Sequence, residues 1–304
     1  MEALSSGAAL LLRPTAGVLV LLDDDRADFL QRMTTNNINA LKAGQAAVTV
    51  LTSPTARIVH VFTVLCRADD LLLLPAPSER AVLEKHLRGK IFFMDKVRVL
   101  NCSDDFVTMR LTGAQAQATL LRAQLPVPAG DDQWLEADGV TVLAQAKFDA
   151  PGYVILASAA RADEVQRVLE SAGALAVDET AWAAHRVQLG RPAAGAELTP
   201  DFTPLEVGLA WACAENKGCY TGQEIIARQQ TYDKVTRTLV RVRSDAPLAL
   251  GMALSAEGRD VGIVTSVAQA TDGSHLALAV VKRPYHAQGA RLQAGDVAVQ
   301  VEAA

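Results

Sequence analysis

The pattern of apolar residues changes once along this chain, near residue 238, and no other feature constrains the fold as much. Before that point, short apolar or alternating runs typical of strands are interspersed with segments in which apolar residues recur every three or four positions, as in helices. After it, only short strands separated by glycine turns are predicted, at 239–242, 261–267, 276–281 and 297–301. The sequence therefore predicts an α+β region followed by a small β-barrel or sandwich.

The first 237 residues carry enough signals for more than one domain. Strands are predicted at 17–22, 48–51, 58–65, 71–74, 97–100, 107–111, 140–144 and 153–157, and helices after Asp24 or Asp25, after Ser78, at 114–125, at 162–172 and from Asp178 to Gly190. Ser53-Pro54 is predicted to join two of the strands in a hairpin. Because 304 residues exceed the usual size of one domain, two or three are expected, with a boundary in the segment 126–132, which is rich in Pro, Gly and Asp.

Charge and cysteine content exclude several classes of protein. The net charge of -5 argues against a nucleic-acid coat or a membrane-surface protein, since both usually need a basic excess. The apolar run 8–22 is interrupted by Arg13 and Pro14, so neither a signal peptide nor a membrane span is expected. Four cysteines without Cys-x-x-Cys spacing are too sparse for a disulfide scaffold. We therefore expect free thiols and a cytoplasmic location.

The segment from 216 to 232 carries the densest chemical signal. Thr221 and Glu224 have the spacing of a capping box, which predicts a helix that begins at Gly222. Cys219 lies just before that start, where free amides and the helix dipole favour a thiolate over a thiol. Lys217 would add a second cation nearby. The segment therefore offers a candidate nucleophile, although a lone cysteine is more often a small buried apolar residue.

The remaining candidates each have two interpretations. Trp182 shares a helical face with Arg186, and is either a core aromatic or a stacking platform for a flat heteroaromatic ligand. The five histidines show no ligand pairing, so no metal site is predicted. The basic residues of one cluster belong either to a solvated strand and loop or to a site for an anionic partner, such as a polyglutamate tail or RNA. They are Arg228, Lys234, Arg237, Arg241 and Arg243.

The run KGCYTGQE at 217–224, with Ala227-Arg228 behind it, resembles the signature of the YgfZ family. These proteins are relatives of the glycine-cleavage aminomethyltransferase (T-protein) and support iron–sulfur enzymes. Weaker similarity extends over nearly the whole chain, at 29–36, 111–116, 182–192 and 203–206. The resemblance implies a three-domain cloverleaf of α+β class. Its parts would be a discontinuous folate-binding domain (1–47 and 130–236), a ferredoxin-like domain (48–129) and a C-terminal antiparallel β-barrel (237–304).

The resemblance also implies the functional residues and partners. Lys217 and Cys219 correspond to the family's Lys and Cys, and are the expected catalytic residues. The expected cofactor is tetrahydrofolate or a derivative, and the expected partners are iron–sulfur enzymes or their assembly proteins, with tRNA as a further candidate and no membrane. The residues expected to bind the folate are Trp182, Arg186, Tyr220, Gln223, Glu224 and Arg228.

Three departures bear on the activity. Aminomethyltransferases carry acids at positions that correspond here to Val154, Gln188 and Val82. Transfer of an aminomethyl group needs a carboxylate to handle amine protons, so the lost acids argue against it. The leading hypothesis is a folate-dependent accessory protein for assembly or repair of iron–sulfur enzymes, with Cys219 as its reactive group. The alternatives are a one-carbon transferase acting on a small amine or tRNA, and a folate sensor or scaffold in which Cys219 is unreactive.

Overall fold

The computed structural model describes residues 4, 6–13, 16–76, 80–269 and 273–302, without the side chains of residues 80 and 81. Its strands are β1 (Ala9–Arg13), β2 (Leu19–Leu22), β3 (Ala46–Thr52), β4 (Ile58–Cys66), β5 (Leu71–Pro75), β6 (Arg98–Asn101), β7 (Phe106–Thr112), β8 (Trp134–Ala137), β9 (Val140–Gln145), β10 (Gly152–Ser158), β11 (Leu175–Ala176), β12 (Arg237–Ser244), β13 (Ala253–Ala256), β14 (Arg259–Gln269), β15 (His275–Lys282), β16 (Arg291–Ala294) and β17 (Val297–Glu302). Its helices are α2 (Arg26–Met33), α3 (Arg80–Arg88), α4 (Ala116–Arg122), α5 (Ala162–Ser171), α6 (Glu179–Gln188) and α7 (Gln223–Thr231), with short 3-10 turns η1 (Ile38–Ala40), η2 (Ser103–Asp105) and η3 (Ala210–Ala212). No helix in this described part of the chain is long and apolar enough to cross a membrane.

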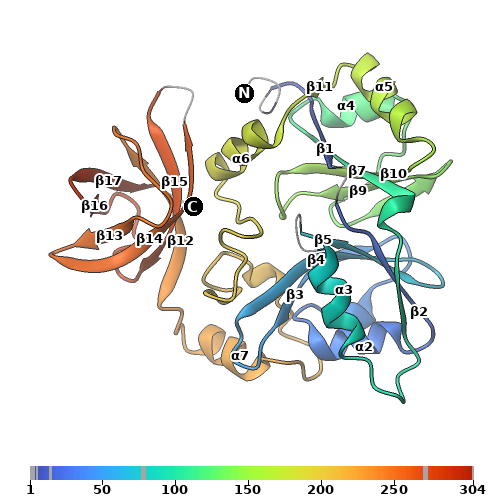
Figure 1. Cartoon of the computed structure of the whole chain (residues 1–304), viewed down its shortest axis with the longest axis horizontal. Helices are drawn as coiled ribbons and strands as arrows, with labels where there is room; N and C mark the ends of the chain where they lie inside the picture. The colour runs from blue at the N-terminus through green and yellow to red at the C-terminus, as the bar shows by residue number, and fades with distance from the viewer. Residues whose placement is uncertain (1–3, 5, 14–15, 77–79, 270–272, 303–304) are drawn as a thin grey trace.

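The strands form two sheets and a barrel, which lie in three regions of the molecule (Figure 1). The first sheet has the order β11-β1-β7-β10-β9-β8, and the second has the order β3-β4-β5-β2-β6. The barrel closes in the order β12-β15-β14-β13-β16-β17, with antiparallel pairs throughout. The predicted α+β fold with a C-terminal antiparallel barrel is therefore confirmed. Closure leaves that barrel without an unpaired edge.

Strand pairing divides the chain differently from the predicted domain ranges. The strand β2, from the range 1–47, pairs with β5 and β6 in the second sheet. The strand β7, from the range 48–129, pairs with β1 and β10 in the first sheet. These partners are far apart in sequence, and local patterns carry no information on which distant strands pair. The ranges 1–47, 48–129 and 130–236 stay a prediction of the domain limits beside this division by sheet.

Alternation along β7 shows how the first sheet separates an apolar face from a polar one. Met109 and Leu111 are buried in a cluster with Val165 of α5 and Leu120 of α4. The side chains between them point the opposite way because successive residues of a strand face opposite sides. Arg110 is therefore held toward the second sheet, where β9 and β10 pack on β4 and β5 through a separate apolar cluster.

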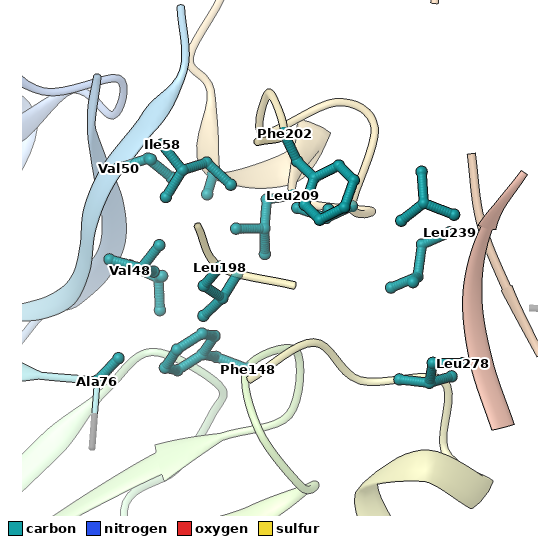
Figure 2. Close-up of a cluster of buried hydrophobic side chains, with 14 of the residues drawn as sticks. Val48, Val50, Ile58, Ala76, Phe148, Leu198, Phe202, Leu209, Leu239 and Leu278 are labelled. Carbon is teal, nitrogen blue, oxygen red and sulfur yellow. The ribbon is translucent and has the colours of Figure 1, made fainter. Parts of the chain in front are cut away.

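An irregular segment between α6 and α7 joins the second sheet to the barrel. Figure 2 shows Leu198, Phe202 and Leu209 of this segment between Val48 on one side and Leu278 of the barrel on the other. All five are buried, and each such side chain contributes roughly 1.5–3 kcal/mol relative to exposure. The hydrophobic effect therefore holds the barrel against the rest of the chain.

The start of β10 gives a test of the first sheet. Gly152 has φ +150°, and a Cβ there would lie 2.2 Å from the carbonyl oxygen of Leu111 on the neighbouring strand. Because the clash is with backbone, we expect Gly152→Ala to lower the free energy of unfolding by about 3 kcal/mol or more. The control Gly195→Ala has φ +75° and open space around its Cβ, and should cost only about 1 kcal/mol. Equal losses in urea unfolding would contradict the close approach.

Candidate functional site

Two adjoining cavities lie where the two sheets and α6 meet. The larger, here called the central cavity, has a volume of about 160 Å³ and is bounded by α6, the loop before β10 and the segment after Gly190. The smaller, here called the inner cavity, has a volume of about 50 Å³ and lies between the facing sheets. Arg13, Phe148 and Asp149 line both. A mostly apolar cavity with a few converging polar groups is the usual form of a small-molecule site.

The carboxylate of Asp149 is the polar centre of this region. Its Oδ1 accepts a hydrogen bond of 2.8 Å from Nε1 of Trp182, and its Oδ2 accepts one of 2.8 Å from Nη1 of Arg13. Nε of Arg110 lies 3.6 Å from the same Oδ2. Burial acts to raise the pKa of Asp149, but Arg110, Arg13 and the Trp182 bond outweigh it and hold that pKa below its ordinary value. The group is therefore an ionised acceptor at neutral pH.

Trp182 and Arg186 both line the central cavity, as their predicted role in ligand binding requires. The Trp182 side chain is only 1% exposed, and the guanidinium groups of Arg13 and Arg110 lie 5.4 and 5.8 Å from its ring centroid. A ligand could stack on this ring only if a neighbouring side chain moved. Stacking therefore stays a prediction, while the visible role of the indole is to orient Asp149.

Arg186 connects α6 to the barrel. Its Nη1 lies 3.3 Å from Oε2 of the fully buried Glu197, and its Nη2 donates a 2.7 Å hydrogen bond to Oγ of Ser266 on β14. Ser266 in turn donates to Oε1 of Glu197. Such a desolvated, mutually bonded group is costly to break. The contribution of Arg186 to ligand binding stays a prediction, since its Nη1 and Nη2 are already bonded in this network.

Lys217 ties the KGCYTGQE segment to the end of α2. Its Nζ donates to the carbonyl oxygens of Thr34 and Asn36, at 2.5 and 2.6 Å, and lies 4.9 Å from the ring centroid of Tyr220. Burial lowers the pKa of Lys217 to about 8, although the nearby Cys213 acts to raise it. A lysine with such a pKa has a substantial neutral fraction near physiological pH, which suits a group that exchanges protons.

The predicted capping box at Thr221 and Glu224 is wrong. The N-cap of α7 is Gly222, with φ 84° and no side-chain cap. A Cβ on Gly222 would lie 2.7 Å from the carbonyl oxygen of Ser53, and the carbonyl of Thr221 accepts a bond from the hydroxyl of Thr52. Close approach to the β3–β4 hairpin therefore decides how the helix begins. Glu224 pairs with exposed Arg228 at 2.6 Å instead of reaching back to the cap.

The other predicted site residues lie away from the central cavity. Cys219 is exposed and lines neither cavity, whereas Cys213 is buried and burial raises the pKa of its thiol to about 12. Tyr220 and Gln223 line a polar groove of about 310 Å³ along α7. Figure 1 shows α7 well apart from α6. The predicted residues thus fall into two regions, and within the described residues no group of three His, Cys, Asp or Glu side chains could hold a metal ion.

Three residues of the site were not predicted. Arg13 and Asp149 line both cavities, and Arg110 lines the inner one. Together they form the charged part of the cavity walls. A signal did exist for the arginines, because each stands in or at the end of an apolar strand, and a buried charge must be paired. Val154 stands where the resemblance implies an acid in aminomethyltransferases, but Asp149 supplies a carboxylate from the loop just before β10.

Comparison with known families shows to which family this chain belongs. The chain matches the family described as the GCVT N-terminal domain over residues 21–217. It belongs to this family. A proposed chloroplastic transferase of Arabidopsis thaliana is 31% identical to this GCVT-family protein, over 97% of this chain and 70% of the relative.

Further relatives show how far the resemblance reaches. The tRNA-modifying protein YgfZ of Serratia proteamaculans is 25% identical over 84% of this chain and 79% of its own. The crystal structure of the glycine cleavage system aminomethyltransferase T of Bartonella henselae superposes with a TM-score of 0.87 at 20% identity, covering 99% of this chain and 86% of that one. The fold is therefore that of the T-protein, and the predicted resemblance is confirmed at the level of the GCVT family. Membership of its YgfZ branch stays a prediction.

The lowered pKa of Lys217 can be tested through stability. In the unfolded chain the pKa of a lysine is ~10.4. Between pH 8 and 10 the unfolded state therefore binds more protons than the folded state, and the free energy of unfolding rises with pH. Lys217→Met lacks this contribution. We expect the difference between wild type and variant to grow by roughly 1 kcal/mol over that range, since water screens this half-buried site. Urea unfolding at both pH values measures it, and a constant difference would contradict the lowered pKa.

Proposed function

We propose that this GCVT-family protein binds a reduced folate, tetrahydrofolate or a derivative, in the central cavity. The observation that carries the proposal is the ionised carboxylate of Asp149 on the wall of a cavity that is otherwise largely apolar. The pterin ring presents an N–H and an amino group side by side, a pair of donors that a carboxylate can accept together. The relative from Bartonella henselae is named as an aminomethyltransferase of the glycine cleavage system, which is consistent with a folate ligand.

The residues present fit such a ligand. Each oxygen of Asp149 makes one close hydrogen bond, to Trp182 or Arg13, and keeps a further lone pair for a ligand. Phe148 and Leu198 supply apolar walls for a flat ring. A bound reduced folate would supply carriage of a one-carbon unit. The role of Asp149 would be to orient the pterin rather than to donate a proton, because its pKa is lowered.

A titration with tetrahydrofolate tests this assignment. Asp149→Asn keeps the shape but removes the charge, and we expect it to weaken binding about ten-fold or more. Trp182→Ala should weaken binding as well, because it releases the carboxylate. The matched control is Glu206→Gln, which removes another buried carboxylate, paired with Arg237 away from the cavity. Unchanged affinity in Asp149→Asn, or equal loss in the control, would place the ligand elsewhere.

We propose further that the protein supports iron–sulfur enzymes through Cys219, as in the YgfZ branch. The exposure of this thiol favours the idea, since Cys213 is buried and Cys66 and Cys102 are half-buried. Burial raises the pKa of these two thiols as well. A single thiolate cannot hold a cluster alone, so a client or assembly protein would have to supply the other ligands. The remaining alternatives are a one-carbon transferase acting on a small amine or on tRNA, and a folate sensor or scaffold in which Cys219 is unreactive.

Complementation of cells that lack the protein distinguishes these functions. We expect Cys219→Ser to abolish the support of iron–sulfur enzyme activity, and Lys217→Ala to do the same. The control Cys102→Ser should retain it, because that thiol is half-buried and distant in sequence from the segment. Full support by Cys219→Ser would remove the role of this thiol. Turnover of methylamine donors with tetrahydrofolate by the purified protein would favour the transferase.

A further inference from the structure

The inner cavity contains polar groups that the fold does not satisfy. Nε of Arg110 and Oγ1 of Thr108 are buried and have no hydrogen-bond partner among the described residues, although Nε lies 3.6 Å from Oδ2 of Asp149 in an ion pair. Both residues line the cavity, and they are only 3% and 7% exposed. An unsatisfied buried donor costs about 1–3 kcal/mol, and more when it is charged. Folded proteins therefore seldom keep two of them side by side without a ligand or water to bond them.

The charged groups around the inner cavity form one connected set. Two guanidinium groups, from Arg13 and Arg110, line it together with one carboxylate, Asp149. Glu179 also pairs with Arg13, at 2.9 Å, but it is largely exposed on the rim of the central cavity and does not line the inner one. Burial lowers the pKa of Arg110 to about 10, with Asp149 acting to raise it and Arg13 to lower it. The two guanidinium groups are thus balanced by Asp149 and Glu179, and of these four groups only Glu179 lies outside the lining of the inner cavity.

Strand register brings the donors together. Thr108 and Arg110 are two residues apart on β7 and so share a face, and Arg13 of β1 stands directly opposite Thr108. The polar groups on the remaining walls already have partners. Gln145 accepts a 3.0 Å bond from Nη1 of Arg110 and donates a 3.1 Å bond to the hydroxyl of Thr63. A ligand of this cavity must therefore bring hydrogen-bond acceptors, and a charged acceptor forms the strongest bond with the guanidinium of Arg110.

We propose that the inner cavity is a subsite for a carboxylate group, which accepts hydrogen bonds from Arg110 and Thr108 and faces Arg13. A volume of about 50 Å³ admits the carboxylate itself or a molecule as small as formate. The remainder of a larger acid would extend into the central cavity, because the two cavities share Arg13, Phe148 and Asp149. Where the proposed folate also binds, the carboxylate belongs either to a second, small acid substrate or to the glutamate tail of the folate.

Titration of the full-length protein with ¹³C-formate, without folate, tests the subsite by NMR or calorimetry. We expect saturable binding of one formate, about ten-fold weaker in Thr108→Val because one hydrogen bond to a charged group is lost. Thr141→Val is the matched control, since Thr141 is equally buried in the same sheet and does not line the cavity. It should bind formate as the wild type does. Arg110→Lys keeps the charge but not the fork of donors, and should also weaken binding.

Several outcomes would overturn the proposal. These are absence of saturable formate binding, equal affinity in Thr108→Val and wild type, and equally tight binding of methylammonium, a cation of similar size. The last comparison uses the wild type alone and so stands even if a variant fails to fold. Competition between formate and tetrahydrofolate would assign the subsite to the tail of the folate. Simultaneous binding of formate and tetrahydrofolate would assign the subsite to a second, small acid substrate. Formate binding in a protein that does not bind folate would support the subsite while rejecting the folate assignment.

Discussion

One buried carboxylate joins the elements that enclose both cavities. Asp149, on the loop before β10, meets Arg13 from β1, Arg110 from β7 and Trp182 from α6. Removing one partner from a buried group of ion pairs leaves the remaining charges unpaired where water solvates them poorly. This costs far more than the loss of an exposed ion pair. The contacts of Asp149, which would position the proposed folate, therefore also hold the first sheet to α6. A substitution in this group is therefore expected to change both stability and the proposed binding.

Much of the fold could be predicted from the sequence. The strands β1, β13 and β16 were missed, and two further exceptions, β8 and β11, share a physical cause. The hairpin of β3 and β4, the strands β7, β9 and β10, and the all-β end of the chain follow from alternation, apolar runs and turn residues. The strands β8 and β11 were not predicted, and most of their residues are exposed. Both lie at the edges of the first sheet. A strand held mainly by backbone pairing at an edge leaves little hydrophobic pattern to detect.

The functional site was harder to predict from the sequence than the fold, because tertiary contacts override local signals there. Lys217 was recognised as a cation of interest, but its bonds to carbonyl groups at the end of α2 depend on a contact between distant segments. Gly222 replaces the expected cap because the β3–β4 hairpin passes too close for a side chain. The convergence of Arg13, Arg110 and Asp149 depends on strand register across three separate segments. No local spacing encodes that register.

The position of β1 has a consequence for how the chain is made. This strand lies inside the first sheet, between β7 and β11, so that Ala9 pairs with Thr112 and with Leu175. At ribosomal rates, on the order of ten seconds separate the emergence of the first strand from that of β7. During that interval an apolar strand stays unpaired on the nascent polypeptide. The first sheet therefore cannot close around β1 until both β7 and β11 have been synthesised.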